Sequence, residues 1–225
     1  DWQNIYQLGI FHLIRTPRDA KRLCNAVQMA LGFVGEEIAI VDLVALETIR
    51  VLRPALFEKI VEHAGLLAPS PLMLDRHADT RRDAIERKRY DDIVASAPGD
   101  EVPVKQLLKR LFPASMRISD NTFYGAEFLK TWRKERKVAH PEILNFYLEH
   151  EFSAGVPSPS QTRAVFEVLG NEAASGPLFD AIDGEVLEKL IERLEDFEND
   201  FTPEIAEPGV RAILNRASRL RVART

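Results

Sequence analysis

Apolar residues recur three or four positions apart along most of the 225-residue chain. After Thr16 they fall at Ala20, Leu23, Cys24, Val27, Ala30 and Leu31. Nearer the end of the chain they fall at Val186, Leu187, Leu190, Ile191, Leu194 and Phe197. This spacing is typical of amphipathic helices, and the β-like run 102–104 is too short for a strand. We therefore predict an all-α protein, an irregular multi-helix bundle, and leave open a division into two helical subdomains.

The clearest signal for the start of a helix lies at Thr16. Its hydroxyl can accept a backbone N–H of the first turn, and Pro17 suits the first helical position. Asp19, three residues after Thr16, completes a shortened capping box. Gly32 is the predicted stop. Cys24 falls on the apolar face of this helix, so we interpret it as a core residue rather than a nucleophile.

A second helix is predicted from Asp42, as its cap, to Leu52. Within it Glu47 and Arg50 are three positions apart, close enough to pair. Residues 75–97 are rich in charge and predict an exposed helix or a partly mobile arm. The residues of this segment suited to burial are Ile85, Tyr90, Ile93 and Val94.

Prolines and polar caps indicate where the later helices begin. His140-Pro141 is predicted to open one helix, and Pro177 and Pro208 to open two others. Asp183 is the predicted cap of the helix 185–199. The remaining predicted helices span residues 2–14, 54–64, 102–112, 127–136 and 160–169.

Composition narrows the classes of protein to consider. The formal net charge is −5 and the pI is about 5.6, which argues against nucleic acid as the main partner. The single cysteine suits a reducing cytoplasm. No apolar run approaches the roughly 18–20 residues of a membrane span, and no signal-peptide pattern is present. We therefore expect a cytoplasmic chain without a transmembrane segment. Because it begins at Asp1 without a methionine, we also expect it to be part of a longer protein.

Cations crowd the predicted start of the Pro17 helix, where the helix dipole disfavours each of them by roughly 0.3–1 kcal/mol. They are Arg15, Arg18, Lys21 and Arg22. A bound anion would explain this cluster. In the alternative interpretation the side chains reach solvent or pair with Asp19 and Glu36.

A second basic cluster surrounds Trp132. It consists of Lys130, Arg133, Lys134, Arg136 and Lys137. It is either a solvated helix face or a surface for an anionic partner protein. The chain contains no GxxxxGK[ST] loop and no HExxH motif, and its histidines are not spaced as metal ligands usually are. We therefore expect no metal site, no cofactor bound by this chain alone and no independent catalytic site.

Two stretches of the sequence together resemble the end of the P-loop domain in KAP-family NTPases. The first is TPRDAKRLCNAV with its continuation EIAIVDLVALETIRVLRPALFEKI, and the second is WRKERKVAHPEILNFYLEHEF. The resemblance implies a parent P-loop ATPase that binds ATP and Mg. It also implies that the upstream P-loop domain is a partner of this chain. With this resemblance, the chain is expected to have three parts. They are a lid-like segment 1–67, a charged arm with connecting helices 68–139, and a helical subdomain 140–225.

In this family an arginine in a TPRD-like turn reaches the γ-phosphate from a helical lid. The resemblance implies that role for Arg18, with Lys21 and Arg22 beside it. The predicted function is then a regulatory lid that couples the nucleotide state to a partner protein. The alternative is a helical protein–protein interaction module with no role in nucleotide binding.

Overall fold

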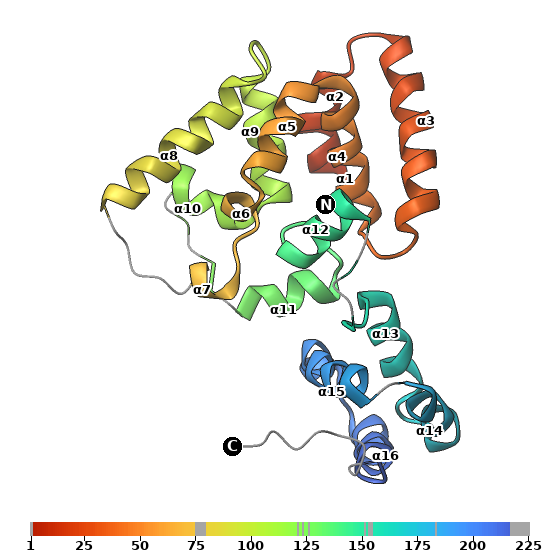
Figure 1. Ribbon diagram of the computed structural model, residues 1–225. Coiled ribbons are helices and arrows are strands. Elements are labelled where there is room, and N and C mark those ends of the chain that lie inside the picture. Colours follow the sequence, from red (N-terminus) through yellow and green to blue (C-terminus); the bar gives the residue numbers. More distant parts are fainter. Residues whose placement is uncertain are drawn as a thin grey trace. The chain divides into compact units, whose positions relative to one another are not determined.

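The computed structural model describes residues 2–74, 80–120, 122, 124–125, 127–150, 152, 155–182 and 184–216. Every regular element within these ranges is a helix, which confirms the predicted all-α fold (Figure 1). The chain divides into two compact units, Asp1–Glu151 and Phe152–Thr225. No helix in the described ranges combines the length and the apolar content needed to cross a membrane.

The first unit contains the longer part of the chain. Its helices are α1 (Trp2–Ile5), the π-helix η1 (Tyr6–Ile10), α2 (Phe11–Leu13), α3 (Pro17–Val34), α4 (Ile40–Leu52), α5 (Pro54–Glu62), α6 (Ala64–Leu67), α7 (Pro71–Leu74), α8 (Thr80–Ala95), α9 (Glu101–Leu111), the 3₁₀ helix η2 (Pro113–Ser115), α10 (Met116–Ser119), α11 (Glu127–Lys134) and α12 (Pro141–Glu149). The second unit contains α13 (Pro159–Val168), α14 (Glu172–Ala181), α15 (Gly184–Arg193), the 3₁₀ helix η3 (Leu194–Asp200) and α16 (Pro203–Leu214).

The boundary between the units falls later in the chain than the predicted boundary at residues 139/140. Helix α12 belongs to the first unit because buried hydrogen bonds join its region to α4. The backbone N–H of Val138 donates to Asp42 Oδ2 at 3.0 Å, and the Tyr147 hydroxyl donates to Glu47 Oε1 at 2.7 Å. The predicted parts 1–67 and 68–139 likewise lie together in this unit.

Helix α3 begins as the sequence predicts and ends later. Thr16 Oγ1 accepts the N–H of Asp19 at 3.2 Å, and Asp19 Oδ2 accepts the N–H of Thr16 at 3.0 Å. The predicted stop at Gly32 is wrong, because the positive φ of 53° that ends the helix occurs at Gly35. Cys24 is exposed rather than buried, because α3 contacts its unit along a narrow face.

Helix α4 forms the centre of the first unit. Its stretch from Leu43 to Ile49 is buried apart from the half-buried Val44, and it packs against α3, α5, α9 and α1. The predicted cap Asp42 does not cap α4, since the N-cap position is occupied by Ala39. The Asp42 carboxylate instead accepts the backbone N–H of Val138.

One carboxylate, that of Asp100, joins three connections between helices. It accepts from Arg15 Nη2 at 2.9 Å and from Arg53 Nε at 2.6 Å. Arg15 precedes α3, Arg53 lies between α4 and α5, and Asp100 is the N-cap of α9. Burial acts to raise the pKa of Asp100, but the hydrogen bonds from the two arginines outweigh it and hold the pKa below its usual value. Arg15 is therefore an internal ion-pair partner rather than part of a free cationic cluster.

Helix α8 agrees in part with the predicted charged helix. Tyr90, Ile93 and Val94 are buried as predicted, whereas Ile85 is 54% exposed. The buried neighbour of Ile85 is Glu86, whose carboxylate pairs with Arg117 Nη2 of α10 at 2.6 Å. The helix therefore buries a paired carboxylate next to the position where the sequence predicts a buried apolar residue.

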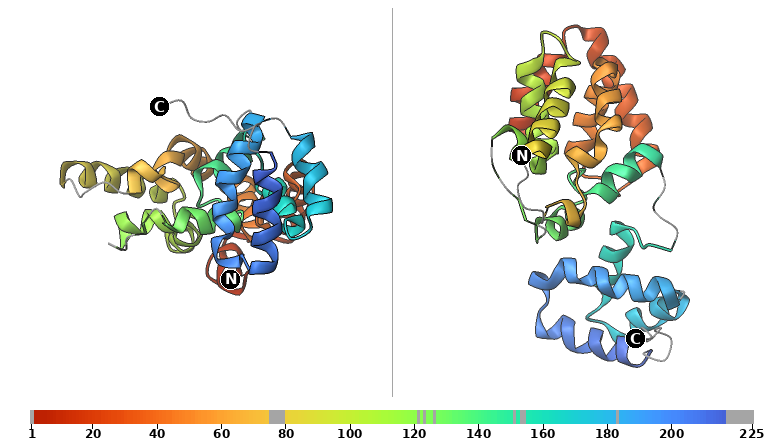
Figure 2. Two further views of the ribbon diagram at one scale, coloured as in Figure 1. Left: turned by 90° about the horizontal axis from the view of Figure 1, so that it is seen from below. Right: turned by 60° about the vertical axis from the view of Figure 1, so that its left-hand side comes forward.

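The second unit is built around seven buried apolar residues contributed by its helices. They are Val165, Leu169, Phe179, Leu187, Leu190, Leu194 and Ala212. Helices α14 and α16 lie side by side, as Figure 2 also shows. Pro177 and Pro208 do not begin helices as predicted, since each lies inside one. The predicted cap Asp183, and the predicted helix beyond Arg216, lie outside the described residues.

The close approach of η1 and α9 allows a sharp test of packing. An ideal Cβ added to Gly9 would lie 2.5 Å from Leu107 Cγ, whereas one added to Gly32 meets nothing within 4 Å. We expect Gly9→Ala to lower the free energy of unfolding by about 1–3 kcal/mol, because Leu107 is fully buried and must shift. Gly32→Ala in α3 is the control for Gly9→Ala. We expect this control to raise the free energy of unfolding by about 0.5–1 kcal/mol. Urea unfolding of both variants checks this, and equal effects would contradict the packing of η1 on α9.

The buried carboxyl of Asp42 predicts a pH-dependent stability. Burial raises its pKa to about 6, from 3.8, despite the hydrogen bond from Val138. The folded state therefore binds this proton more tightly than the unfolded state, so the contribution of Asp42 to stability grows as the pH falls from about 7 to 4. Asp42→Asn keeps an acceptor for Val138 but does not titrate. We expect the stability of this variant relative to the original protein to fall by about 1–3 kcal/mol between pH 7.5 and pH 4. Urea unfolding at both pH values checks this, and an unchanged or rising difference would contradict it.

Candidate functional site

A groove of about 610 Å³ lies between α3 on one side and α4, α5 and α12 on the other. Helix α3 lies at the edge of the first unit, beside α4, in Figure 1 and in the right-hand view of Figure 2. It buries only Leu23, Ala30 and Val34 of its 18 residues. We call this hollow the α3 groove.

The wall of the α3 groove contains a buried carboxylate that holds two neighbouring polar side chains. Glu47 is 2% exposed, and both of its oxygens accept from Arg50 Nε at 3.0 Å. Arg50 Nη2 also donates to Glu47. The Tyr147 hydroxyl donates to Glu47 Oε1 at 2.7 Å. The hydrogen bond to Glu47 raises the pKa of Arg50, and burial together with Glu47 raises that of Tyr147. The predicted pairing of Glu47 with Arg50 is thereby confirmed.

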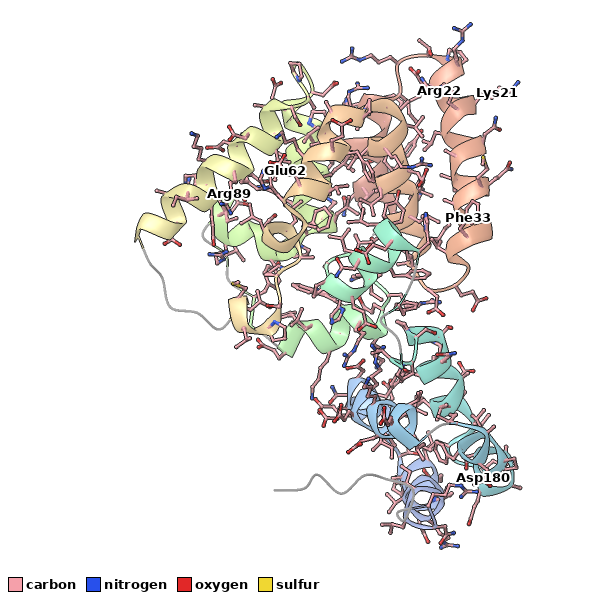
Figure 3. The ribbon with its side chains drawn as sticks, viewed as in Figure 1. Lys21, Arg22, Phe33, Glu62, Arg89 and Asp180 are labelled. Carbon is pink, nitrogen blue, oxygen red and sulfur yellow. The ribbon has the colours of Figure 1, made fainter. Side chains whose placement is uncertain are left out.

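One end of the α3 groove is cationic. Arg22 Nη2 donates to the carbonyl of Val51 at 3.3 Å, and Arg50, the neighbour of Val51, keeps 45% of its side chain exposed. Figure 3 shows Arg22 on the side of α3 that faces α4 and Lys21 on the opposite side. Arg22 of α3 and Arg50 of α4 both line the groove.

The other end of the α3 groove is apolar and aromatic. Phe33 is 69% exposed and Met29 is 66% exposed, both on α3. The Phe33 ring stacks on His150 with centroids 5.9 Å apart. Val61 of α5, 44% exposed, lines the same hollow. No group of three or more potential metal ligands occurs among the described residues.

Arg18, Lys21 and Arg22, to which the resemblance assigns nucleotide binding, differ in their relation to the α3 groove. Arg18, Lys21 and Arg22 are all exposed in the first two turns of α3. Of the three, Arg22 lines the α3 groove, and Arg18 and Lys21 do not. The resemblance-based role of Arg18 at a γ-phosphate stays a prediction.

The second basic cluster is partly engaged within the chain. Lys130, Arg133 and Lys134 are half-buried, and each takes part in an interaction with other residues. Arg136 donates to the carbonyl of Glu36, and Lys137 pairs with Glu135 at 2.5 Å. A role of these residues in binding a partner stays a prediction.

Several residues of the α3 groove carry no signal in the sequence. Tyr147 lies on α12 and His150 directly follows it, and the sequence predicts only core packing for this helix. Phe33 follows Gly32, the residue at which the sequence predicts the end of the helix. Their grouping depends on contacts across about 100 positions, such as that between Tyr147 and Glu47. A pattern of neighbouring residues in the sequence cannot predict such a long-range contact.

No family model, curated protein or solved structure matches this chain. The resemblance to KAP-family NTPases therefore stays a prediction.

Proposed function

We propose that this chain is a helical protein–protein interaction module that receives a segment of a partner protein in the α3 groove. The observation that carries the proposal is the position of α3. An 18-residue helix buries three side chains and leaves Met29 and Phe33 exposed beside a hollow of about 610 Å³. Large apolar side chains exposed around a concave surface are typical of interaction sites.

The chemistry of the α3 groove favours a role in binding over a role in catalysis. Its buried carboxylate, Glu47, already accepts hydrogen bonds from Arg50 and Tyr147. A general acid or base must exchange a proton with a substrate, so a carboxylate occupied in this way is poorly placed to act as one. The same bonds fix the wall of the groove, which lowers the entropic cost of binding.

A displayed library of helical peptides tests this function without a known partner. We expect peptides selected on the protein to lose at least about tenfold in affinity when Phe33 is changed to Asp, because a charge replaces an apolar anchor. Ile85→Asp is the matched control, since Ile85 is also exposed but lies on α8. Titration by fluorescence anisotropy measures both effects. Failure to select any peptide, or equal losses in the two variants, would overturn the proposal.

The resemblance to KAP-family NTPases supports a second proposal, a lid that senses nucleotide in a P-loop ATPase. Arg18 and Lys21 are exposed, and neither makes a hydrogen bond or ion pair within the part of the chain that the structure describes. In this proposal Arg18 contacts the γ-phosphate of ATP, which binds with Mg in the P-loop domain of the parent protein. Binding to one nucleotide state more than another would then bias the packing of α3.

The lid proposal requires a protein that contains this chain together with a P-loop domain. We expect Arg18→Ala in that protein to reduce ATP turnover by about tenfold or more, because a cation near the transferred phosphate is lost. Lys88→Ala, a change of an exposed cation on α8, is the control. Unchanged turnover together with unchanged nucleotide affinity rejects the lid function and leaves the interaction module unaffected.

A further inference from the structure

We propose that the α3 groove takes an amphipathic helix in one orientation, with its carboxyl-terminal end beside Arg22 and Arg50. This inference rests on the proposed function, because it names the kind of segment that the interaction module binds. It follows from the polarity of the groove, from its length and from the chemistry of its wall.

The groove is chemically different at its two ends. Arg22 and Arg50 lie near Val51 at one end, and Phe33 and His150 stack at the other. Among the residues that line it, Glu47 is the only acid. Asp19, which lies one turn earlier on α3 and outside the groove, also interacts electrostatically with Arg22. The lining therefore contains two arginines and one carboxylate, an excess of positive charge that is complementary to a negatively charged ligand.

Glu47 prepares Arg50 for such a ligand. It binds Nε and Nη2 of the guanidinium, and 45% of the Arg50 side chain stays exposed. An arginine fixed in this way loses little side-chain entropy on binding a second carboxylate. Arg22 faces the same end from α3. The groove thus has one arginine on its α3 wall and one on its α4 wall.

The shape and chemistry of the wall favour a helix over an extended peptide. An extended peptide needs backbone partners, and helices α3, α4, α5 and α12 use theirs internally. A helix satisfies its own backbone and presents only side chains to Met29, Phe33 and Val61. Arg22 and Phe33 are eleven positions apart on α3, which corresponds to about 16 Å or three helical turns. A docked helix of three to four turns therefore spans the charged and apolar ends together.

The helix dipole sets the direction of binding. The last turn of a helix carries partial negative charge on its free carbonyl groups, and a terminal or side-chain carboxylate adds to it. These groups match Arg22 and Arg50, whereas the amino-terminal end of a helix would be repelled. The apolar stripe of the ligand, at positions i, i+3 or i+4, and i+7, then lies along Met29, Phe33 and Val61.

Two synthetic peptides of equal composition test the inference. Both are amphipathic helices with the same apolar stripe and the same amidated end; one has its Glu residues in the last turn, and the other has the same Glu residues in the first turn. We expect the first to bind about tenfold more tightly, because charge-assisted hydrogen bonds form only in that orientation. Arg22→Gln should reduce this preference by about threefold, and raised salt should reduce it further.

Lys21→Gln is the matched control, since Lys21 is an exposed cation in the same turn that points away from α4. It should leave the preference unchanged. If both peptides bind equally and both are lost in Phe33→Asp, the orientation is overturned while the interaction module stands. If neither peptide binds in a manner that depends on Phe33, the inference fails together with the proposed function. Equal effects of Arg22→Gln and Lys21→Gln would assign the preference to overall charge and overturn the site.

Discussion

The first unit depends on two carboxylates buried on its central helix α4. Asp42 is 6% exposed and Glu47 is 2% exposed. A carboxylate removed from water is costly unless donors surround it, so each requires a fixed partner. The partners come from far along the chain: the backbone of Val138 binds Asp42, and the hydroxyl of Tyr147 binds Glu47. This requirement places α12 against α4 and so builds one wall of the α3 groove.

A third carboxylate controls the opposite side of that groove. Asp100 binds Arg15 just before α3 and Arg53 just after α4, so it fixes the chain at the start of α3. The capping box at Thr16 then sets the direction of the helix. Because α3 is held at its start and through three buried side chains, most of its surface stays available. The exposed apolar residues of α3 are therefore a consequence of how it is attached, and they give the proposed function its physical basis.

Local chemistry made part of this structure predictable. The helical spacing gives the fold class, and the start of α3 at Thr16 follows from three adjacent residues. His140 caps α12 by accepting the N–H of Glu142, and Glu47 pairs with Arg50 within one turn. Each of these features depends on side chains no more than four positions apart, which is the range that sequence patterns can read.

Other features depend on tertiary contacts and could not be predicted in this way. Gly32 continues the helix, and Gly35, three residues later, takes the positive φ that ends it. Pro177 and Pro208 lie inside helices, where the core contacts of their unit outweigh the missing hydrogen bond. The α3 groove brings together side chains of four helices from residue 22 to residue 150. No pattern of neighbouring residues contains that grouping.

The central claim is that α3 forms a binding surface on a fixed wall, and amide hydrogen exchange tests it most directly. In the free protein, amides of α3 between Arg22 and Phe33 should exchange faster than those of α4, because α3 buries three of its side chains and α4 buries seven. Addition of a helical peptide selected on the protein should slow exchange in this part of α3 and leave α8 unchanged. Protection confined to other helices, or no change in α3 when the peptide is bound, would contradict the account.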